Sequence, residues 1–161
     1  MNDRARLYNG TLQEFAKDIL ASGRGDGRVF STGRIHPLIE QDLAEKGESL
    51  ISRDIIVTQK QIFKYRNHPK ILKGAALPLH QYDLITRTIQ APTRIFEDTS
   101  KKSLAYVYIM PYNDLKVVKV VVEPNYRKHD AICNLAKSWG LVDGIDMLGK
   151  QYRELKKQGP R

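Results

Sequence analysis

Hydrophobic positions recur every three to four residues in the first half of the chain, which is the period of an amphipathic helix. Thr11 and Glu14 have the spacing of a capping box, so we expect a helix to begin there and to end in the glycine-rich segment 23–27. Pro37 favours the first turn of a second helix, which Gly47 would end. The pattern therefore predicts helices at the start of the chain.

Two further helical patterns cover residues 59–68 and 79–90, and a proline follows each within two residues. The second half then changes to alternation of apolar and polar residues, which is the period of a β-strand. Apolar spacing at the C-terminus, over residues 141–157, predicts a closing helix. The segments with strand-like patterns are 28–33, 51–57, 93–98, 103–110, 115–123 and 131–139, the last of which also fits a helical period.

From this order we expect an α+β fold. The N-terminal helices would pack on one face of a roughly four-stranded antiparallel β-meander, and a C-terminal helix would complete it. Residues 1–30 would form an N-terminal helix with a flexible connector, and residues 31–161 a single domain.

The net charge of the chain indicates the kind of partner that it binds. The chain has 161 residues, 27 Lys and Arg against 18 Asp and Glu, and a net charge of +9, which favours a polyanion such as RNA. Part of the excess positive charge lies in the C-terminal segment, residues 150–161, where it is also typical of an ordinary solvated surface. The longest apolar stretch is well short of the ~20 residues that a membrane-spanning helix needs, so we expect no membrane contact.

Several chemistries lack their sequence signature. The four histidines are scattered and the single cysteine, Cys133, has no nearby partner ligand, so we expect no metal site. The glycines at 23–27 do not have P-loop spacing, and no Gly-x-Ser-x-Gly motif occurs. We therefore expect no cofactor.

Metal-independent cleavage of RNA needs only a base, an acid and groups that hold the phosphate charge. His68, at the end of a helix, is a candidate acid or base, and Arg66 and Lys64 beside it would suit a phosphate. Lys119 is a candidate cation on a strand. The alternatives are an ordinary surface or core histidine and an edge-strand lysine that blocks sheet extension.

Other polar residues could complete such a site. Asn134 is a candidate catalytic hydrogen-bond donor in an otherwise apolar run, and Tyr106 and Tyr108 could stack on bases or pack in the core. The further candidate contacts to nucleic acid are Arg94, Arg127, Lys128 and Ser138.

The order of these elements resembles the phage-associated nuclease domains of the barnase–EndoU–colicin–RelE superfamily. The resemblance spans residues 31–152 and includes the helix that ends at His68-Pro69, the Ile95-Phe96-Glu97-Asp98 strand and the meander after it. It implies a metal-free ribonuclease in which His68, Lys119 and Asn134 act. The chain departs from the family pattern at Lys64-Tyr65, where a second histidine is expected, and at Asn134, where Thr or Ser is expected.

These observations predict a metal-independent endoribonuclease of phage or toxin type that leaves 2′,3′-cyclic phosphate ends. Its partner would be RNA, and the resemblance adds two candidate protein partners, an acidic immunity or antitoxin protein and phage head proteins. We expect it in the bacterial cytoplasm, or in the virion if a phage encodes it. The alternative is a non-catalytic, basic module that binds nucleic acid or belongs to the phage head.

Overall fold

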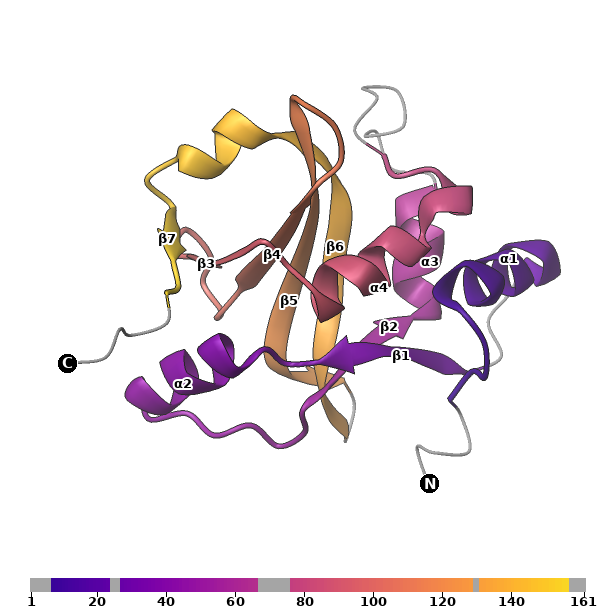
Figure 1. Ribbon diagram of the computed structural model, residues 1–161. Helices are drawn as coiled ribbons and strands as arrows, with labels where there is room; N and C mark the ends of the chain where they lie inside the picture. The colour runs from indigo at the N-terminus through magenta and orange to yellow at the C-terminus, as the bar shows by residue number, and fades with distance from the viewer. Residues whose placement is uncertain (1–6, 24–26, 67–75, 129–130, 157–161) are drawn as a thin grey trace.

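The computed structural model of the chain describes residues 7–23, 27–66, 76–128 and 131–156. In this part, helices pack against a seven-stranded mixed sheet (Figure 1). The helices are α1 (Leu12–Ser22), α2 (Pro37–Glu45), α3 (Gln59–Arg66), the 3-10 helix η3 (Leu79–Gln81), α4 (Asp83–Gln90) and the 3-10 helix η4 (Gly144–Leu148). The strands are β1 (Val29–Arg34), β2 (Asp54–Thr58), β3 (Arg94–Asp98), β4 (Tyr106–Pro111), β5 (Lys116–Lys128), β6 (Ala131–Asp143) and β7 (Tyr152–Glu154).

The sheet order is β1-β2-β6-β5-β4-β3-β7. All neighbouring strands are antiparallel except β2 and β6, in which Ile55 lies opposite Asn134 and Ile56 opposite Leu135. The expected four-stranded antiparallel meander is therefore wrong. Only β3 to β6 form a meander, and β1 and β2 extend one of its edges while β7 extends the other. Pairing between distant short strands leaves no mark on local periodicity, which is why the pattern did not reveal it.

The predicted C-terminal helix over residues 141–157 is also wrong. β6 continues to Asp143, and Leu141 lies opposite Val118 of β5. After η4 the chain returns as β7, which pairs with β3 and places Tyr152 opposite Asp98. Backbone pairing with two strands has thus replaced the helix.

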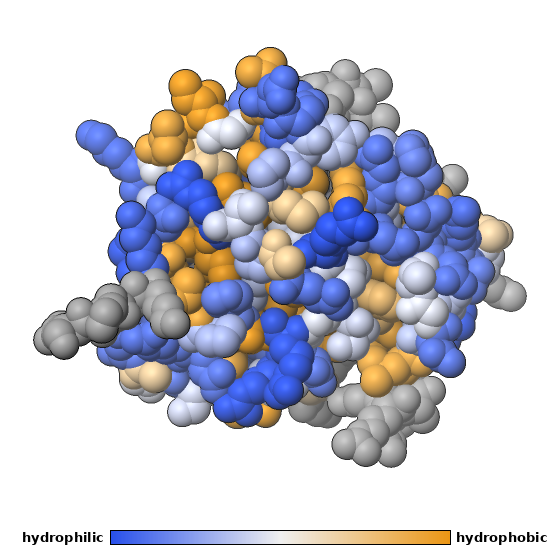
Figure 2. Space-filling model, viewed as in Figure 1, coloured by the Kyte–Doolittle hydropathy of each residue, from blue (hydrophilic) through white to orange (hydrophobic). Residues whose placement is uncertain are grey.

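The sequence of this segment contains the physical reason. Gly144 and Gly149 lie inside the expected helix, and each glycine costs a helix about 1 kcal/mol relative to alanine. Ile145 and Leu148, expected on its buried face, are 74% and 69% exposed, and Leu115 of the β4–β5 turn is 78% exposed. Figure 2 shows hydrophobic residues gathered at the upper left of the view, where η4 lies in Figure 1. The apolar spacing does not mark a core-facing helix here.

Strand β5 is longer than predicted because Pro124 and Asn125 form an irregularity instead of ending it. Asn125 has a φ of 51°, and the register with β6 shifts between Glu123 and Tyr126. The Asn125 side chain donates to the carbonyl of Ser49 at 2.8 Å and accepts from a backbone amide of the α2–β2 loop. This bulge ties the loop before β2 to the long β5–β6 hairpin.

The helix starts agree better with the pattern. The capping box of α1 is present, because Thr11 Oγ1 accepts from the Glu14 amide at 3.1 Å and Glu14 accepts from the Thr11 amide. Helix α2 begins at Pro37, as predicted. The pattern over residues 79–90 corresponds to η3 followed by α4, with Tyr82 between them.

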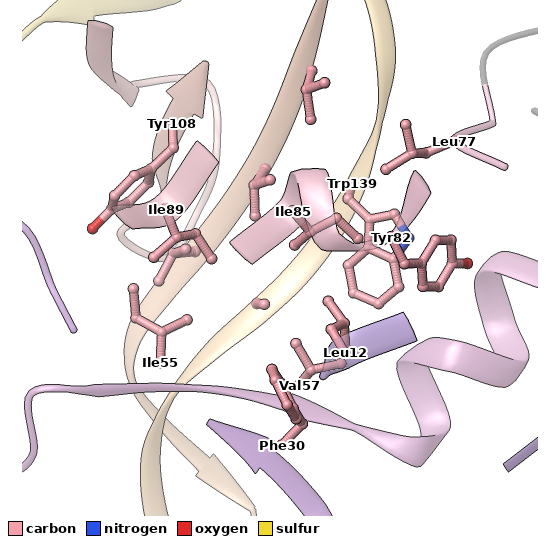
Figure 3. Packing of buried hydrophobic residues seen from close by; sticks show 14 of the residues in the cluster. Leu12, Phe30, Ile55, Val57, Leu77, Tyr82, Ile85, Ile89, Tyr108 and Trp139 are labelled. Carbon is pink, nitrogen blue, oxygen red and sulfur yellow. The ribbon is translucent and has the colours of Figure 1, made fainter. Parts of the chain in front are cut away.

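One main core joins all four α-helices to one face of the sheet. Leu12 of α1, Ile85 of α4 and Tyr108 of β4 are fully buried in it, and Trp139 of β6 lies beside Ile85 and packs edge-on against Tyr82 (Figure 3). Helix α1 and the sheet therefore share a single hydrophobic unit. A smaller cluster on the opposite face contains Phe96, Ala105, Val107, Ile109, Val121 and Met147.

Candidate functional site

Of the predicted catalytic residues, the structure describes the side chains of Lys119 and Asn134, and these two do not come together. Lys119 lies on the sheet face of the smaller cluster, where its Nζ donates to the Tyr152 hydroxyl at 2.8 Å and sits 5.1 Å from the ring centroid. Lys119 pairs with Gly140, six positions beyond Asn134 along β6, so Lys119 and Asn134 are about 20 Å apart. Helix α3 packs on the other face, with Ile62 in the main core.

Asn134 has a structural role. Its side chain is fully buried, and Nδ2 donates to the carbonyls of Ser52 at 2.6 Å and Asp54 at 3.0 Å. Its Oδ1 accepts from the Asn125 amide at 3.1 Å. A carboxamide that uses its donors and acceptor in this way has no group left for a substrate. It instead holds the backbone on both sides of Arg53.

The predicted base-stacking residues Tyr106 and Tyr108 are both fully buried, so neither ring has a face open to a nucleotide. The stacking prediction is wrong for this conformation, and core packing is the role that the structure supports. The Tyr106 hydroxyl donates to Asp42 at 2.6 Å, and the Tyr108 hydroxyl accepts from the His36 amide at 2.9 Å. Alternation along β4 puts both rings on one face of the strand but does not say whether that face is covered, and in the structure both faces are.

The other predicted contacts are dispersed. Arg94 on β3 forms two hydrogen bonds with Glu154, at 3.0 and 2.6 Å. Ser138 is half-buried on β6, Arg127 is exposed near the end of β5, and Lys64 is exposed on α3. His68 lies outside the described residues, as do the side chains of Arg66 and Lys128. The structure therefore does not test the site expected around His68.

A different set of side chains converges where β1 ends and α2 begins. An open pocket of about 490 Å³ lies there, between the start of α2 and the end of α4. We call it the histidine pocket. Its lining residues are Arg34, Ile35, His36, Pro37, Glu40, Arg53, Ile89 and Gln90.

His36 is the N-cap of α2 and has a fixed orientation. Its Nδ1 accepts from the Leu38 amide at 3.1 Å, and its own amide donates to the buried Tyr108 hydroxyl. Because Nδ1 is an acceptor, the neutral ring carries its proton on Nε2. Partial burial lowers the pKa of His36 below its ordinary value. The ring is thus held in one tautomer beside the pocket.

Glu40 follows His36 by one turn of α2, since the Glu40 amide donates to the His36 carbonyl at 3.1 Å. Arg53 donates two hydrogen bonds to the Glu40 carboxylate, from Nε at 3.3 Å and from Nη2 at 2.5 Å. These hydrogen bonds, with the attraction between the two charges, raise the pKa of Arg53. A histidine, a carboxylate and an arginine fork therefore lie at one opening.

Arg34 adds a second cation to the histidine pocket. It is the exposed last residue of β1, and it pairs in register with Asp54, the neighbour of Arg53. In the part of the chain that the structure describes, the Arg34 guanidinium makes no ion pair. Two arginines beside a histidine and a carboxylate suit a phosphate group, because guanidinium donors match phosphate oxygens.

Sequence reasoning missed this site because each residue had an ordinary explanation. Pro37 indicated the start of a helix, and His36 was one of four scattered histidines without a metal-ligand spacing. The available signal was the spacing of Arg34, His36 and Glu40, which puts a cation before the N-cap and a carboxylate one turn after it. Arg53 joins them only through the pairing of β1 with β2.

A second group of charges lies at the other end of α2, and we call it the charge cluster. Asp42 accepts from Lys46 at 2.8 Å, from Arg153 of β7 at 2.7 Å and from Tyr106. Glu97 of β3 accepts from the same lysine and arginine, at 3.3 and 2.7 Å. The hydrogen bonds of this cluster attach α2 to three strands, β3, β4 and β7. Its members are Asp42, Lys46, Glu97, Arg153 and Tyr106.

The described residues include no group of three or more His, Cys, Asp and Glu side chains that could hold a metal ion. No helix among the described residues is long and apolar enough to cross a membrane.

Comparisons of the chain with protein-family models, with curated proteins and with solved structures find no match.

Proposed function

We propose that the chain is a metal-independent endoribonuclease that cleaves RNA in the histidine pocket. The observation that carries this proposal is the convergence of His36 and Glu40 with two arginines on one open pocket. These are the parts that cleavage without a metal requires, namely an acid, a base and cations for the phosphate. The net charge of +9 supports a polyanionic substrate.

The pocket chemistry begins when the scissile phosphate binds Arg34 and Arg53. Phosphate oxygens replace the Glu40 carboxylate on the Arg53 fork and leave that carboxylate available as a base. Glu40 then takes the proton of the 2′-hydroxyl, and the 2′-oxygen forms a bond to phosphorus. The bond from phosphorus to the 5′-oxygen breaks, which leaves a 2′,3′-cyclic phosphate.

The departing 5′-oxygen takes a proton from Nε2 of His36. This step requires a doubly protonated imidazole, so Nδ1 must first gain a proton and release the Leu38 amide. The negative phosphate favours that protonation, whereas burial opposes it. Exchange with water afterwards removes the proton from Glu40 and restores the one on His36. Cleavage should consequently be faster at mildly acidic than at alkaline pH.

The test is incubation of labelled RNA in EDTA with the wild type and with His36→Asn. Asparagine is a good N-cap, so this variant keeps the start of α2 but has no proton to transfer. We expect the wild type to produce 2′,3′-cyclic phosphate ends, and the variant to be slower by roughly 100- to 10,000-fold. His80→Asn, at an exposed histidine of η3, is the matched control and should behave as the wild type.

Three other outcomes would contradict the proposal. Intact RNA with the wild type would exclude a ribonuclease and, with retained binding, would favour the basic nucleic-acid-binding module. Cleavage that His36→Asn keeps would move the chemistry away from the histidine pocket. Cleavage lost only in His68→Asn would assign the chemistry to His68.

A further inference from the structure

The exposed face of α4 leads directly into the histidine pocket. Gln90, the last residue of α4, lines the pocket, and Arg87 is exposed one turn before it. Residues three apart on a helix have Cβ atoms about 5–6 Å apart on the same side. An RNA strand bound in the pocket could therefore continue along this face of α4.

Packing beneath α4 fixes which residues face outward. Ile85 and Ile89 are buried in the main core, and Thr86 shares a 2.8 Å hydrogen bond with Thr32 of β1. These contacts leave Arg87 on the solvent side. In the described part of the chain Arg87 forms no ion pair.

Gly33 brings β1 unusually close to the end of α4. Its φ is +150°, and a Cβ at this position would lie 2.9 Å from Ile89 Cγ2 and 3.5 Å from Gln90 Cγ. Without a side chain at Gly33, the strand can approach, and the next residue, Arg34, reaches the pocket beside Gln90. Arg34, Gln90 and Arg87 thus form a continuous strip across β1 and α4, which we call the α4 strip.

We propose that the α4 strip binds the RNA next to the scissile bond, with Arg87 on the phosphate of the neighbouring nucleotide. Gln90 lies between the two cations and offers both a donor and an acceptor to the base or sugar between those phosphates. The substrate class is then single-stranded RNA with at least one phosphate beyond the scissile one. This inference rests on the proposed function, because it assigns the scissile phosphate to the histidine pocket.

Arg87 also has an ordinary explanation, since a cation in the last turn of a helix stabilises the helix dipole. The dipole acts on stability and does not depend on the length of an RNA. A length-dependent effect on cleavage therefore separates the two roles.

The experiment measures steady-state cleavage of a dinucleotide, which has only the scissile phosphate, and of a hexanucleotide. Arg87→Gln should raise KM for the hexanucleotide about fivefold, leave its kcat unchanged and leave the dinucleotide unaffected. It should also reduce the salt dependence of hexanucleotide affinity by about 0.7 in slope, the amount expected for one phosphate of a single strand. Lys150→Gln, at an exposed cation between η4 and β7, is the matched control and should change neither substrate.

Equal effects on both lengths, or no effect on either, would overturn the role of Arg87. Failure of the proposed function looks different, because the wild type would then cleave neither RNA. In that case binding of a 2′-O-methyl hexanucleotide replaces cleavage as the readout. The α4 strip still predicts weaker binding by Arg87→Gln and unchanged binding by Lys150→Gln, and equal affinities would refute it.

Discussion

The two ends of α2 carry the same kinds of side chain in opposite states. At the C-terminal end, the Asp42 side chain is 7% exposed and Glu97 is 11% exposed, and the protein supplies all their partners. At the N-terminal end, Glu40 is 39% exposed and Arg53 is 55% exposed, and Arg34 beside them makes no ion pair in the described residues. Asp42 and Arg153 also line a pocket, of about 270 Å³, but the two carboxylates of the charge cluster are buried and keep their protein partners, whereas the exposed Glu40–Arg53 pair borders the larger histidine pocket.

Burial separates the structural charges at one end of α2 from the charges that can bind a ligand at the other. A buried carboxylate must keep its partners, because an unpaired charge in the interior is costly. An exposed pair can exchange one partner for a ligand, because water shares the cost of separating it. The charge cluster therefore attaches α2 to the sheet, while the histidine pocket at the other end can bind a phosphate.

The largest expected effect comes from breaking the charge cluster. Asp42→Ala removes the carboxylate shared by Lys46, Arg153 and Tyr106. It should lower the free energy of unfolding by about 3 kcal/mol, the low end of the range for a buried pair because Arg153 is 48% exposed. Urea denaturation measures this change. Asp143→Ala removes an exposed partner of Lys116 and is the matched control.

The Asp143 control should change the free energy of unfolding by less than about 0.5 kcal/mol. If both variants lose the same stability, the charge cluster does not anchor α2.

A smaller effect follows from pH. Burial alone would raise the pKa of Asp42, but hydrogen bonds from Lys46, Tyr106 and Arg153 and the charge of Arg153 outweigh it, so the pKa is lowered. A carboxyl with a lowered pKa stabilises the fold above its unfolded-state pKa of about 3.9 and loses that contribution as the pH falls through the folded-state pKa. We therefore expect stability from Asp42 to disappear below about pH 4.

Urea denaturation of the wild type and of Asp42→Asn between pH 7 and pH 2 checks this. The difference between the two proteins should shrink as the pH falls below about 4. Glu154, whose pKa is lowered by its hydrogen bond with Arg94, responds in the same direction but is present in both proteins. A difference that stays constant to pH 2 would contradict the assigned role of the Asp42 charge.

The smallest effect on stability, and a clear one on binding, is expected at the histidine pocket. Arg34→Gln should leave the free energy of unfolding within about 0.5 kcal/mol of the wild type. It should weaken binding of a single-stranded RNA about fivefold and reduce the salt slope by about 0.7. Fluorescence anisotropy at several salt concentrations measures both. Unchanged affinity would mean that the phosphate does not reach Arg34.

Local signals predicted local structure well. The Thr11–Glu14 capping box and the proline at the start of α2 depend on residues within one helical turn, so the sequence contains everything they need. The alternation along β4 was also correct, but it could not show that both faces of that strand are buried, and so it left base stacking and core packing open for Tyr106 and Tyr108. Burial depends on what the rest of the chain places over the strand.

The candidate site shows the same limit. Arg34, His36 and Glu40 are close in sequence, yet Arg53 and Gln90 reach them only through sheet pairing and helix packing. Asn134 was singled out correctly as an unusual polar residue in an apolar run. Its partners are backbone carbonyls about 80 residues earlier in the chain, so no local pattern could reveal that its role is to hold a loop.

The parallel pairing of β2 with β6 also determines the order in which the molecule can be completed. During synthesis, Arg34, His36, Glu40 and Arg53 all leave the ribosome before β6 exists. Until then, Asn134 cannot hold the backbone around Arg53, and β2 has no partner on that side. Closing so long a loop costs conformational entropy, and folds rich in such distant pairings form slowly. A nascent chain that ends before β6 therefore contains every lining residue of the histidine pocket and lacks the geometry on which its chemistry depends.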